Sequence, residues 1–151
     1  RGAEHSGKVV ANMNLATLLL DLGQRTEARD LYEQVIAGYT SQLGADHTRT
    51  LTAKMNLANI LAELGHCMEA RDLYEEVIAA YTSQLGADHT DTLHAKMNLA
   101  VLLATIGELG GAFRVCQDVV RGYAIAYGAE HAETVDAKEL LDRIERFMKD
   151  R

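Results

Sequence analysis

Apolar residues recur with helical spacing along the chain, and the pattern is clearest in residues 44–85. In the first half of this segment they fall on one face of a helix: Leu51, Leu57, Ala58, Leu61 and Leu64. After Gly65, which can adopt the left-handed conformation that ends a helix, a second stripe follows: Ala70, Leu73, Tyr74, Val77, Ile78 and Tyr81. The pattern predicts helices at 48–64 and 66–84. We expect the preceding Gly-Ala-Asp-His segment to form a loop, and a hydroxyl of Thr48 or Thr50 to cap the first helix.

This pair of helices repeats with a fixed period. Gly2, Gly44, Gly86 and Gly128 are 42 residues apart, and each is followed by Ala, an acidic residue and His. The copies predict repeats 2–43, 44–85 and 86–127, with helices at 6–22 and 24–42, 48–64 and 66–84, and 90–106 and 108–126. Because a single hairpin cannot bury its own apolar stripe, neighbouring units must stack to form the core. We therefore expect one all-α domain over residues 1–151.

The C-terminal segment, 128–151, predicts a lone capping helix at 132–149. Earlier copies have Ala16, Ala58 and Ala100 where a partner helix approaches, and the corresponding residue here is Asp142. Polar residues occupy one face of this helix: Glu133, Glu139, Glu145 and Arg146. Apolar residues that can cover the last hairpin occupy another: Leu140, Leu141, Ile144 and Phe147. We expect the array to end here with a solvated surface.

The first helix has no such polar surface. It carries the apolar run Leu18-Leu19-Leu20. We expect part of this surface to be exposed in a single copy and to allow a homodimer through the N-terminal end. The chain starts at Arg1, one residue before a repeat boundary, and we expect it to be part of a longer protein.

Several features together place the repeat in a known family. A Leu-Ala pair recurs in the first helices as Leu15-Ala16, Leu57-Ala58 and Leu99-Ala100. The second helices carry Ala28, Ala70 and Ala112, followed four residues later by Tyr32, Tyr74 and Cys116. This arrangement resembles the tetratricopeptide repeat family. The longer period, the Gly-x-x-His loop and the Asn-Leu-Ala segment are similar to repeats of the kinesin-light-chain type. The family's usual proline is absent, and Met13, Met55 and Met97 stand where that type usually has a second asparagine.

The resemblance implies a right-handed superhelical solenoid of three hairpins plus a capping helix, which acts as a protein–protein interaction scaffold. It also implies that the first helices line a concave groove for a peptide or protein segment. The matching positions in the first copy are Val10, Met13, Asn14, Thr17 and Asp21. Those in the second copy are Thr52, Met55, Asn56, Asn59 and Glu63. Those in the third copy are His94, Met97, Asn98, Val101 and Thr105.

The repeated asparagines, Asn14, Asn56 and Asn98, can hold a peptide backbone because an amide both donates and accepts hydrogen bonds. The alternative is that they bond neighbouring helices and never touch a ligand. The methionines would add flexible apolar contacts. Kinesin light chains bind acidic peptides, whereas the net charge of this chain is −7, which argues against that ligand class. The heat-shock-chaperone type grips a terminal carboxylate with a lysine that is missing here.

Composition narrows the remaining function classes. The negative charge argues against general nucleic-acid or anionic-membrane binding. Two cysteines, Cys67 and Cys116, have no metal-binding spacing and no disulfide framework, which favours free thiols in a reducing, cytoplasmic compartment. We expect Cys116, at a packing tyrosine's position, to be buried, and Cys67 to lie near a helix start.

The acid–His pairs are candidate metal ligands, but successive loops lie too far apart to share an ion. We expect each histidine to fix its own loop instead. No phosphate loop or nucleophile motif is present, so we predict neither an enzyme nor a cofactor. Two rival functions remain: a structural spacer or self-assembling array, and a regulatory module of a larger enzyme or signalling protein.

Overall fold

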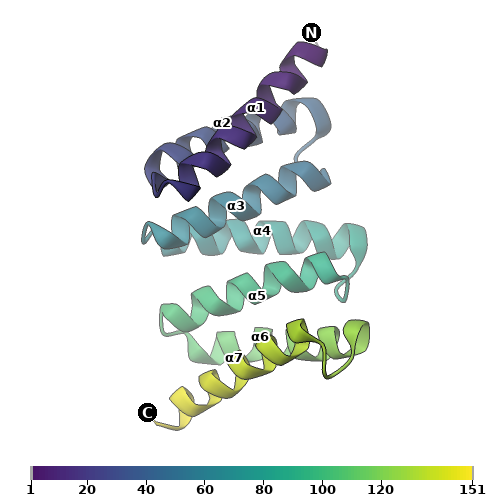
Figure 1. The fold of residues 1–151 in the computed structure, drawn as a ribbon. Coiled ribbons are helices and arrows are strands. Elements are labelled where there is room, and N and C mark those ends of the chain that lie inside the picture. Colours follow the sequence, from purple (N-terminus) through teal and green to yellow (C-terminus); the bar gives the residue numbers. More distant parts are fainter. Residues whose placement is uncertain (1, 151) are drawn as a thin grey trace. The chain divides into compact units, whose positions relative to one another are not determined.

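The computed structural model describes the backbone of residues 2–150 and the side chains of residues 7–150. Within this range the chain is entirely helical, with no strand (Figure 1). The helices are α1 (Gly2–Asp21), α2 (Arg25–Leu43), α3 (Thr48–Glu63), α4 (Cys67–Leu85), α5 (Thr90–Thr105), α6 (Leu109–Tyr127) and α7 (Ala132–Lys149). The predicted hairpins and lone C-terminal helix are confirmed. No helix among the described residues is long and apolar enough to cross a membrane.

The helices group into two compact units, residues 1–73 and 74–151, which divide within α4. In the first unit α1 packs against α2 and α2 packs against α3. In the second unit α5 packs against α6 and α6 packs against α7, while α5 and α7 also touch. In both units, helices that are neighbours in sequence are therefore neighbours in space.

Small residues set the approach of the two helices in each hairpin. Ala16 and Ala28, on α1 and α2, are completely buried, and so are Ala100 and Ala112 on α5 and α6. The larger residue one turn beyond each second-helix alanine is also buried: Tyr32, Tyr74 and Cys116. These positions confirm the predicted alignment of the hairpins. Because interiors are close-packed, a larger side chain at any of these alanines would separate the helices.

Histidine caps the first helix of a repeat, which corrects the prediction of a threonine cap. His47, His89 and His131 each precede a helix, and their Nδ1 atoms accept a hydrogen bond from a backbone N–H at 3.1 Å. Thr50 instead donates its hydroxyl to the carbonyl of Gly44 at 2.8 Å, and Thr92 makes the equivalent bond to Gly86 at 2.9 Å. Threonine therefore closes the loop, while histidine starts the helix.

The first copy departs from this arrangement. The segment predicted as its opening loop is helical, because α1 begins at Gly2 rather than at residue 6. The position of the loop-closing Thr50 and Thr92 is occupied by Lys8, which has no hydroxyl to donate. A helix can therefore continue where the other copies turn. The side chain of His5 lies outside the described residues.

One face of α7 packs on the last hairpin, as predicted, with one difference. Thr134, Ala137 and Ile144 are buried against α6, whereas Asp142 is exposed. Phe147, which was predicted to cover the last hairpin, is 60% exposed. Phe147 lies on the same side of α7 as the buried Ile144 three residues earlier, but near the end of the helix, where both residues line an open cavity with α5.

Candidate functional site

The predicted groove residues are surface residues in both units, as a binding role requires. On α1 and α3 the exposed ones are Val10, Asn14, Thr17, Asp21, Thr52 and Glu63, and the half-buried ones are Met13, Met55, Asn56 and Asn59. On α5 the exposed ones are His94, Val101 and Thr105, and the half-buried ones are Met97 and Asn98. None is fully buried. These side chains therefore lie at the surface and are not part of the buried hairpin core.

In the first unit, hydrogen bonds tie the groove face to α2. Asn56 Nδ2 donates to the Tyr32 hydroxyl oxygen at 3.5 Å, and that hydroxyl also lies 3.5 Å from Thr17 Oγ1. Thr17 donates to the carbonyl of Met13 at 3.0 Å. Contacts of 3.5 Å are weak hydrogen bonds, so a ligand could replace them at little cost. Asn56 thus has a structural partner, as the alternative interpretation requires, and it keeps unused hydrogen-bonding capacity.

Glu63 is engaged elsewhere in this unit. Its carboxylate forms an ion pair with Arg25, the first residue of α2. Both side chains are about half exposed, so the pair contributes little to stability. It does neutralise the predicted groove residue, which is less able to attract a cationic ligand.

In the second unit, the predicted groove residue His94 belongs to an aromatic cluster. Its ring lies 5.5 Å from that of Tyr123, and Tyr127 stacks between Tyr123 and His131, with centroid distances of 5.7 and 4.3 Å. His94 Nε2 also lies 3.5 Å from a carboxylate oxygen of Glu133. Burial, followed by the charge of Glu133 and the neighbouring Tyr127, raises the pKa of the Tyr123 hydroxyl well above its usual value. The phenol therefore stays neutral and helps to join α5, α6 and α7.

A cavity of about 320 Å³ opens between α5 and α7. Its lining is mainly apolar and includes one guanidinium: Val101, Ala104, Thr105, Leu140, Arg143, Ile144 and Phe147. Val101 is 46% exposed and Phe147 is 60% exposed, so both can contact a ligand. A second hollow of about 350 Å³ adjoins it and is lined by Arg143, Arg146, Phe147 and Asp150. Two predicted groove residues, Val101 and Thr105, thus border a concave surface.

Sequence reasoning missed the contribution of α7 to this surface. Leu140, Arg143 and Phe147 occupy the same repeat positions as the predicted groove residues Asn98, Val101 and Thr105. The 42-residue period contained that signal. It was overlooked because α7 was interpreted only as a cap.

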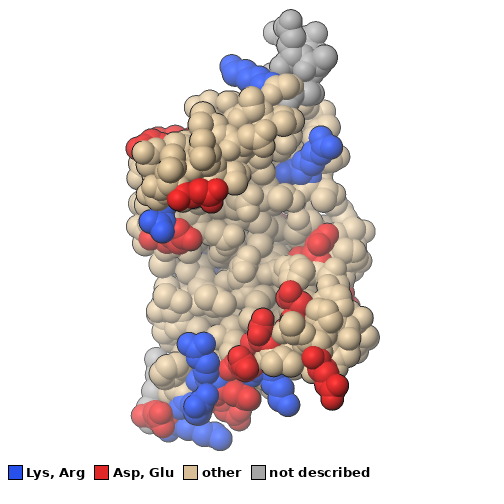
Figure 2. Space-filling model, viewed as in Figure 1, with Lys and Arg blue, Asp and Glu red and all other residues tan. Residues whose placement is uncertain are grey.

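The local charge at this cavity differs from that of the whole chain. Arg143 and Arg146 make no ion pair with another described residue, whereas Lys149 lies 3.9 Å from Glu145. Figure 2 shows Lys and Arg side chains gathered, together with Asp and Glu, at the α7 end of the chain. Two guanidiniums that are not neutralised by neighbours can attract a carboxylate.

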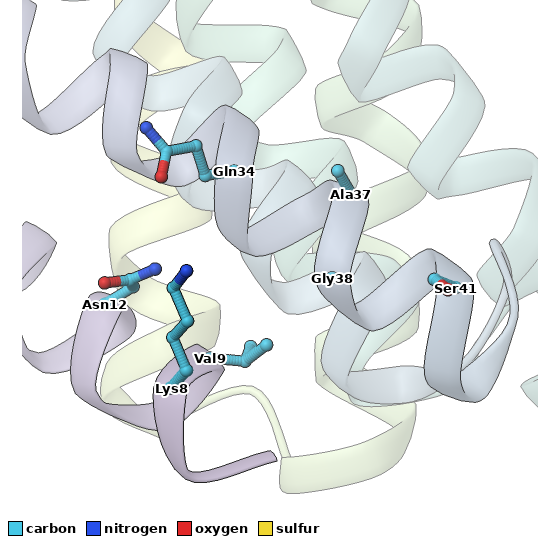
Figure 3. A pocket seen from close by; sticks show the side chains of 7 residues that line it. All are labelled: Lys8, Val9, Asn12, Gln34, Ala37, Gly38 and Ser41. Carbon is cyan, nitrogen blue, oxygen red and sulfur yellow. The ribbon is translucent and has the colours of Figure 1, made fainter. Parts of the chain in front are cut away.

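Another cavity, of about 360 Å³, lies between α1 and α2 (Figure 3). Lys8, Val9 and Asn12 line it from α1, and Gln34, Ala37, Gly38 and Ser41 line it from α2. None of these residues was a predicted groove position. The cavity gives Val9 room to move, but it brings together no group of catalytic residues.

The remaining candidate chemistry is structural. Each described loop histidine uses its Nδ1 as a helix cap, which confirms the prediction that it fixes its loop. Cys116 is buried, as predicted, and its thiol lies 3.3 Å from the carbonyl of Ala137. Burial raises the pKa of the Cys116 thiol to about 11. Cys67 is the first residue of α4 and is half-buried.

Comparison with known proteins agrees with this architecture. The tetratricopeptide repeat family model matches residues 9–83 and 49–124. A solved structure from Podosopora anserina, of TPR-like repeats that are nearly identical to one another and are assigned to a kinesin light chain, superposes on this chain with a TM-score of 0.81 at 27% identity. A variant of that protein superposes with a TM-score of 0.82 at 27% identity. BtubC (BKLC) from P. vanneervenii gives 0.71 at 17% identity and supports the fold alone.

These matches cover 91%, 93% and 95% of this chain but only 65%, 66% and 65% of the respective structures. No curated protein sequence matches the chain significantly. The family model spans well over half of the sequence, and the structural neighbours share its helical hairpins. The chain is therefore a member of the tetratricopeptide repeat family, an all-α helical-repeat solenoid whose repeats are similar to those of the kinesin-light-chain type.

Proposed function

We propose that this chain is a protein–protein interaction scaffold that binds a peptide or protein segment along the groove faces of its first helices. Tetratricopeptide repeats generally mediate protein–protein interaction. The observation that carries the finer proposal is the cavity between α5 and α7, where Val101 and Phe147 are exposed above an apolar floor. A large exposed aromatic residue beside a concave apolar surface is typical of a binding site.

The chemistry of the cavity supports a ligand with an apolar side chain next to a carboxylate. The apolar group would enter between Val101 and Leu140, and Phe147 would cover it. The carboxylate would meet Arg143 and Arg146, whose planar guanidiniums suit bidentate hydrogen bonds. The net charge of the whole chain argued against acidic ligands, but the local charge supports one acidic group at this end.

The groove faces of the other first helices would extend the contact. Asn56 and Asn98 are half-buried, and Asn98 makes no hydrogen bond to another described residue. An amide with free donors and acceptors can bond the backbone of an extended segment. The same proposal treats residues 1–151 as one binding array. It includes no catalytic activity, cofactor, nucleic-acid partner or membrane partner. It places the protein in the cytoplasm, which the two free thiols support.

Peptides selected from a random displayed library against the full chain test the proposal. Phe147→Ser and Arg143→Glu should each lower the affinity for the selected peptides about tenfold or more, because loss of a central anchor removes most of its binding energy. Ile125→Ser is the matched control, since Ile125 is 75% exposed but lies on the second helix α6. Equal binding by wild type and Phe147→Ser, or an equal loss in Ile125→Ser, would place the ligand elsewhere.

A second candidate function is self-assembly through the N-terminal end. We propose it because three leucines at this end are exposed: Leu15 is 47% and Leu18 is 52% exposed on α1, and Leu22, directly after the helix, is 64% exposed. The predicted run Leu18-Leu19-Leu20 is only partly exposed, since Leu19 and Leu20 are half-buried. Consecutive residues point to different faces of a helix, so the exposed surface follows helical spacing instead of sequence order.

A further inference from the structure

The first unit has a buried tyrosine whose hydroxyl reaches the groove face. Tyr32 on α2 is buried, and its hydroxyl oxygen lies 3.5 Å from Thr17 Oγ1 and 3.5 Å from Asn56 Nδ2. Thr17 and Asn56 are predicted groove residues on α1 and α3. The phenol therefore extends from the second helix to side chains of two successive first helices. We call Thr17, Tyr32 and Asn56 the first rung.

The third copy replaces every residue of the first rung by an apolar one. Two periods later, the same repeat positions form what we call the third rung: Val101, Cys116 and Leu140. The second copy keeps polar residues at these positions: Asn59, Tyr74 and Asn98. A phenol oxygen away from water needs hydrogen-bonding partners, so the tyrosine and its polar neighbours form a set. Loss of the tyrosine in the third copy coincides with loss of both polar neighbours.

The cavity of about 320 Å³ between α5 and α7 lies at the third rung, since Val101 and Leu140 both line it. Cys116 is completely buried, and its thiol lies 3.3 Å from the backbone carbonyl of Ala137 on α7. By repeat equivalence, a tyrosine at residue 116 would reach Val101 and Leu140, as Tyr32 reaches its own two partners. Cysteine is far shorter, so the space that a phenol would fill is left open.

The open side of this cavity belongs to the groove face and not to the face on which second helices pack. Val101 on α5 is 46% exposed although α6 packs against α5. On α7, Arg143 occupies the repeat position of Val101. A second helix that packed on α7 as α6 packs on α5 would therefore leave the cavity open. Its accessibility is a property of the repeat itself.

We propose that Cys116 is a specificity-determining residue: its short side chain opens a pocket at the third rung for one large apolar side chain of the bound segment, which takes the place of the missing phenol. This inference rests on the proposed function and names the residue that gives one part of the groove its preference. A cavity of about 320 Å³ is at the low end for ligand pockets, so it suits a single side chain. Cys116 acts through its size, and its thiol takes no chemical part.

Charge complementarity supports a peptide segment as the occupant of this pocket. Arg143 is part of the lining, and Arg146 lines the adjoining hollow. Guanidinium groups donate hydrogen bonds to carbonyl and carboxylate oxygens, which a peptide carries beside its side chains and a pure hydrocarbon lacks. The first rung presents hydroxyl and amide groups instead, so it suits the polar backbone of a segment. Only the third rung therefore selects a large apolar side chain.

Peptide selection against the full chain, followed by affinity measurement, tests this role. The selected peptides should share a large apolar residue at one fixed position. Cys116→Tyr should lower their affinity about tenfold or more, because its ring fills the pocket from the side of α6. Cys116→Ala is the matched control, which removes the thiol but keeps the pocket, and it should bind the peptides like the wild type. Peptides without a shared large apolar residue, or equal binding by Cys116→Tyr and the wild type, would overturn the proposal.

A double-mutant cycle tests whether residue 116 and the shared peptide residue act at the same place. Replacing that peptide residue by alanine should lower affinity about tenfold or more with the wild type, and far less with Cys116→Tyr, whose pocket is already filled. Losses that simply add would overturn the proposal. If circular dichroism shows that Cys116→Tyr does not fold, Val101→Trp fills the same pocket from its half-exposed side and should give the same cycle, with Ile125→Trp on α6 as the control.

The outcomes separate this inference from the proposed function. Peptides that depend on Phe147 and Arg143 but bind Cys116→Tyr and Val101→Trp like the wild type would leave the groove proposal intact and overturn the pocket. Peptides that depend on neither Phe147 nor Arg143 would overturn both.

Discussion

Two glycines at the same repeat position allow a sharp test of how closely the helices pack. Gly38 lies on α2 and Gly122 on α6, and each faces the first helix of its hairpin. A Cβ at residue 122 would lie 2.7 Å from both Cδ atoms of Leu93 and 3.3 Å from its Cγ. A Cβ at residue 38 would lie 2.7 Å from one methyl of Val9, and its next contact would be at 3.8 Å. The two sites thus differ in how many atoms must move.

The neighbours also differ in their freedom to move. Leu93 is completely buried and packs with Val119, Tyr123 and Ala137. Val9 borders the cavity of about 360 Å³ between α1 and α2 (Figure 3), so its side chain can rotate away from an added methyl group. The same substitution therefore meets a fixed obstacle at residue 122 and a movable one at residue 38.

These differences set the expected changes in the free energy of unfolding. Replacing glycine by alanine inside a helix stabilises the folded chain by about 1 kcal/mol, whereas overpacking a fixed core destabilises it by about 1–3 kcal/mol. We expect Gly38→Ala to be neutral or to stabilise by up to about 1 kcal/mol. Gly122→Ala should destabilise by up to about 2 kcal/mol. Gly7→Ala, at a site with no atom within 4 Å, supplies the value for helix propensity alone.

Urea unfolding followed by circular dichroism measures all three variants against the wild type. A shift of the midpoint without a change of slope identifies a true change of stability. If Gly122→Ala stabilises the chain as much as Gly7→Ala does, then Leu93 does not restrain the approach of α5 and α6, and the reasoning is wrong.

Three further predictions concern the groove, a helix cap and a thiol. Replacing Asn56 and Asn98 together by alanine should lower the affinity for the selected peptides, because each lost hydrogen bond to the peptide costs about 0.5–1.5 kcal/mol. The thermal midpoint of unfolding should stay nearly unchanged. Unchanged affinity would assign both amides a structural role. His131→Ala should lower the free energy of unfolding by about 1 kcal/mol through loss of the α7 cap, and urea unfolding with no midpoint shift would contradict that role. Cys116 should resist iodoacetamide at about pH 8, because thiols react as thiolates and burial raises its pKa to about 11; mass spectrometry that shows rapid labelling in the folded chain would disprove its burial.

The alignment of the hairpins could be predicted from the sequence because it depends on local rules. Alanine at residues 28 and 70, with a tyrosine four positions later, identifies the contact between two helices, and these alanines are fully buried. A fixed period then transfers the assignment from one copy to the next. The number, order and approximate bounds of the helices needed no knowledge of distant contacts.

The helix caps and the α5–α7 cavity were harder to predict for physical reasons. Thr50 and His47 both carry suitable acceptors, and only the three-dimensional course of the loop decides that Thr50 bonds the Gly44 carbonyl while His47 caps the helix. The exposure of Phe147 depends on which residues of α5 and α6 the last helix meets. Such outcomes follow from the position of a neighbouring helix, which propensity and periodicity do not specify.

The loop-closing threonine has a consequence for how such a chain can lengthen. Its bond to the glycine carbonyl spans only six residues, from Gly44 to Thr50 and from Gly86 to Thr92, and the histidine cap lies inside the same segment. Duplication of a DNA segment that encodes 42 residues therefore copies a complete joint together with the hairpin. Unequal recombination between copies can add or remove a whole repeat without any compensating mutation at the junction. The gene can thus change the number of hairpins in a single step, while point mutation separately alters the surface of each helix.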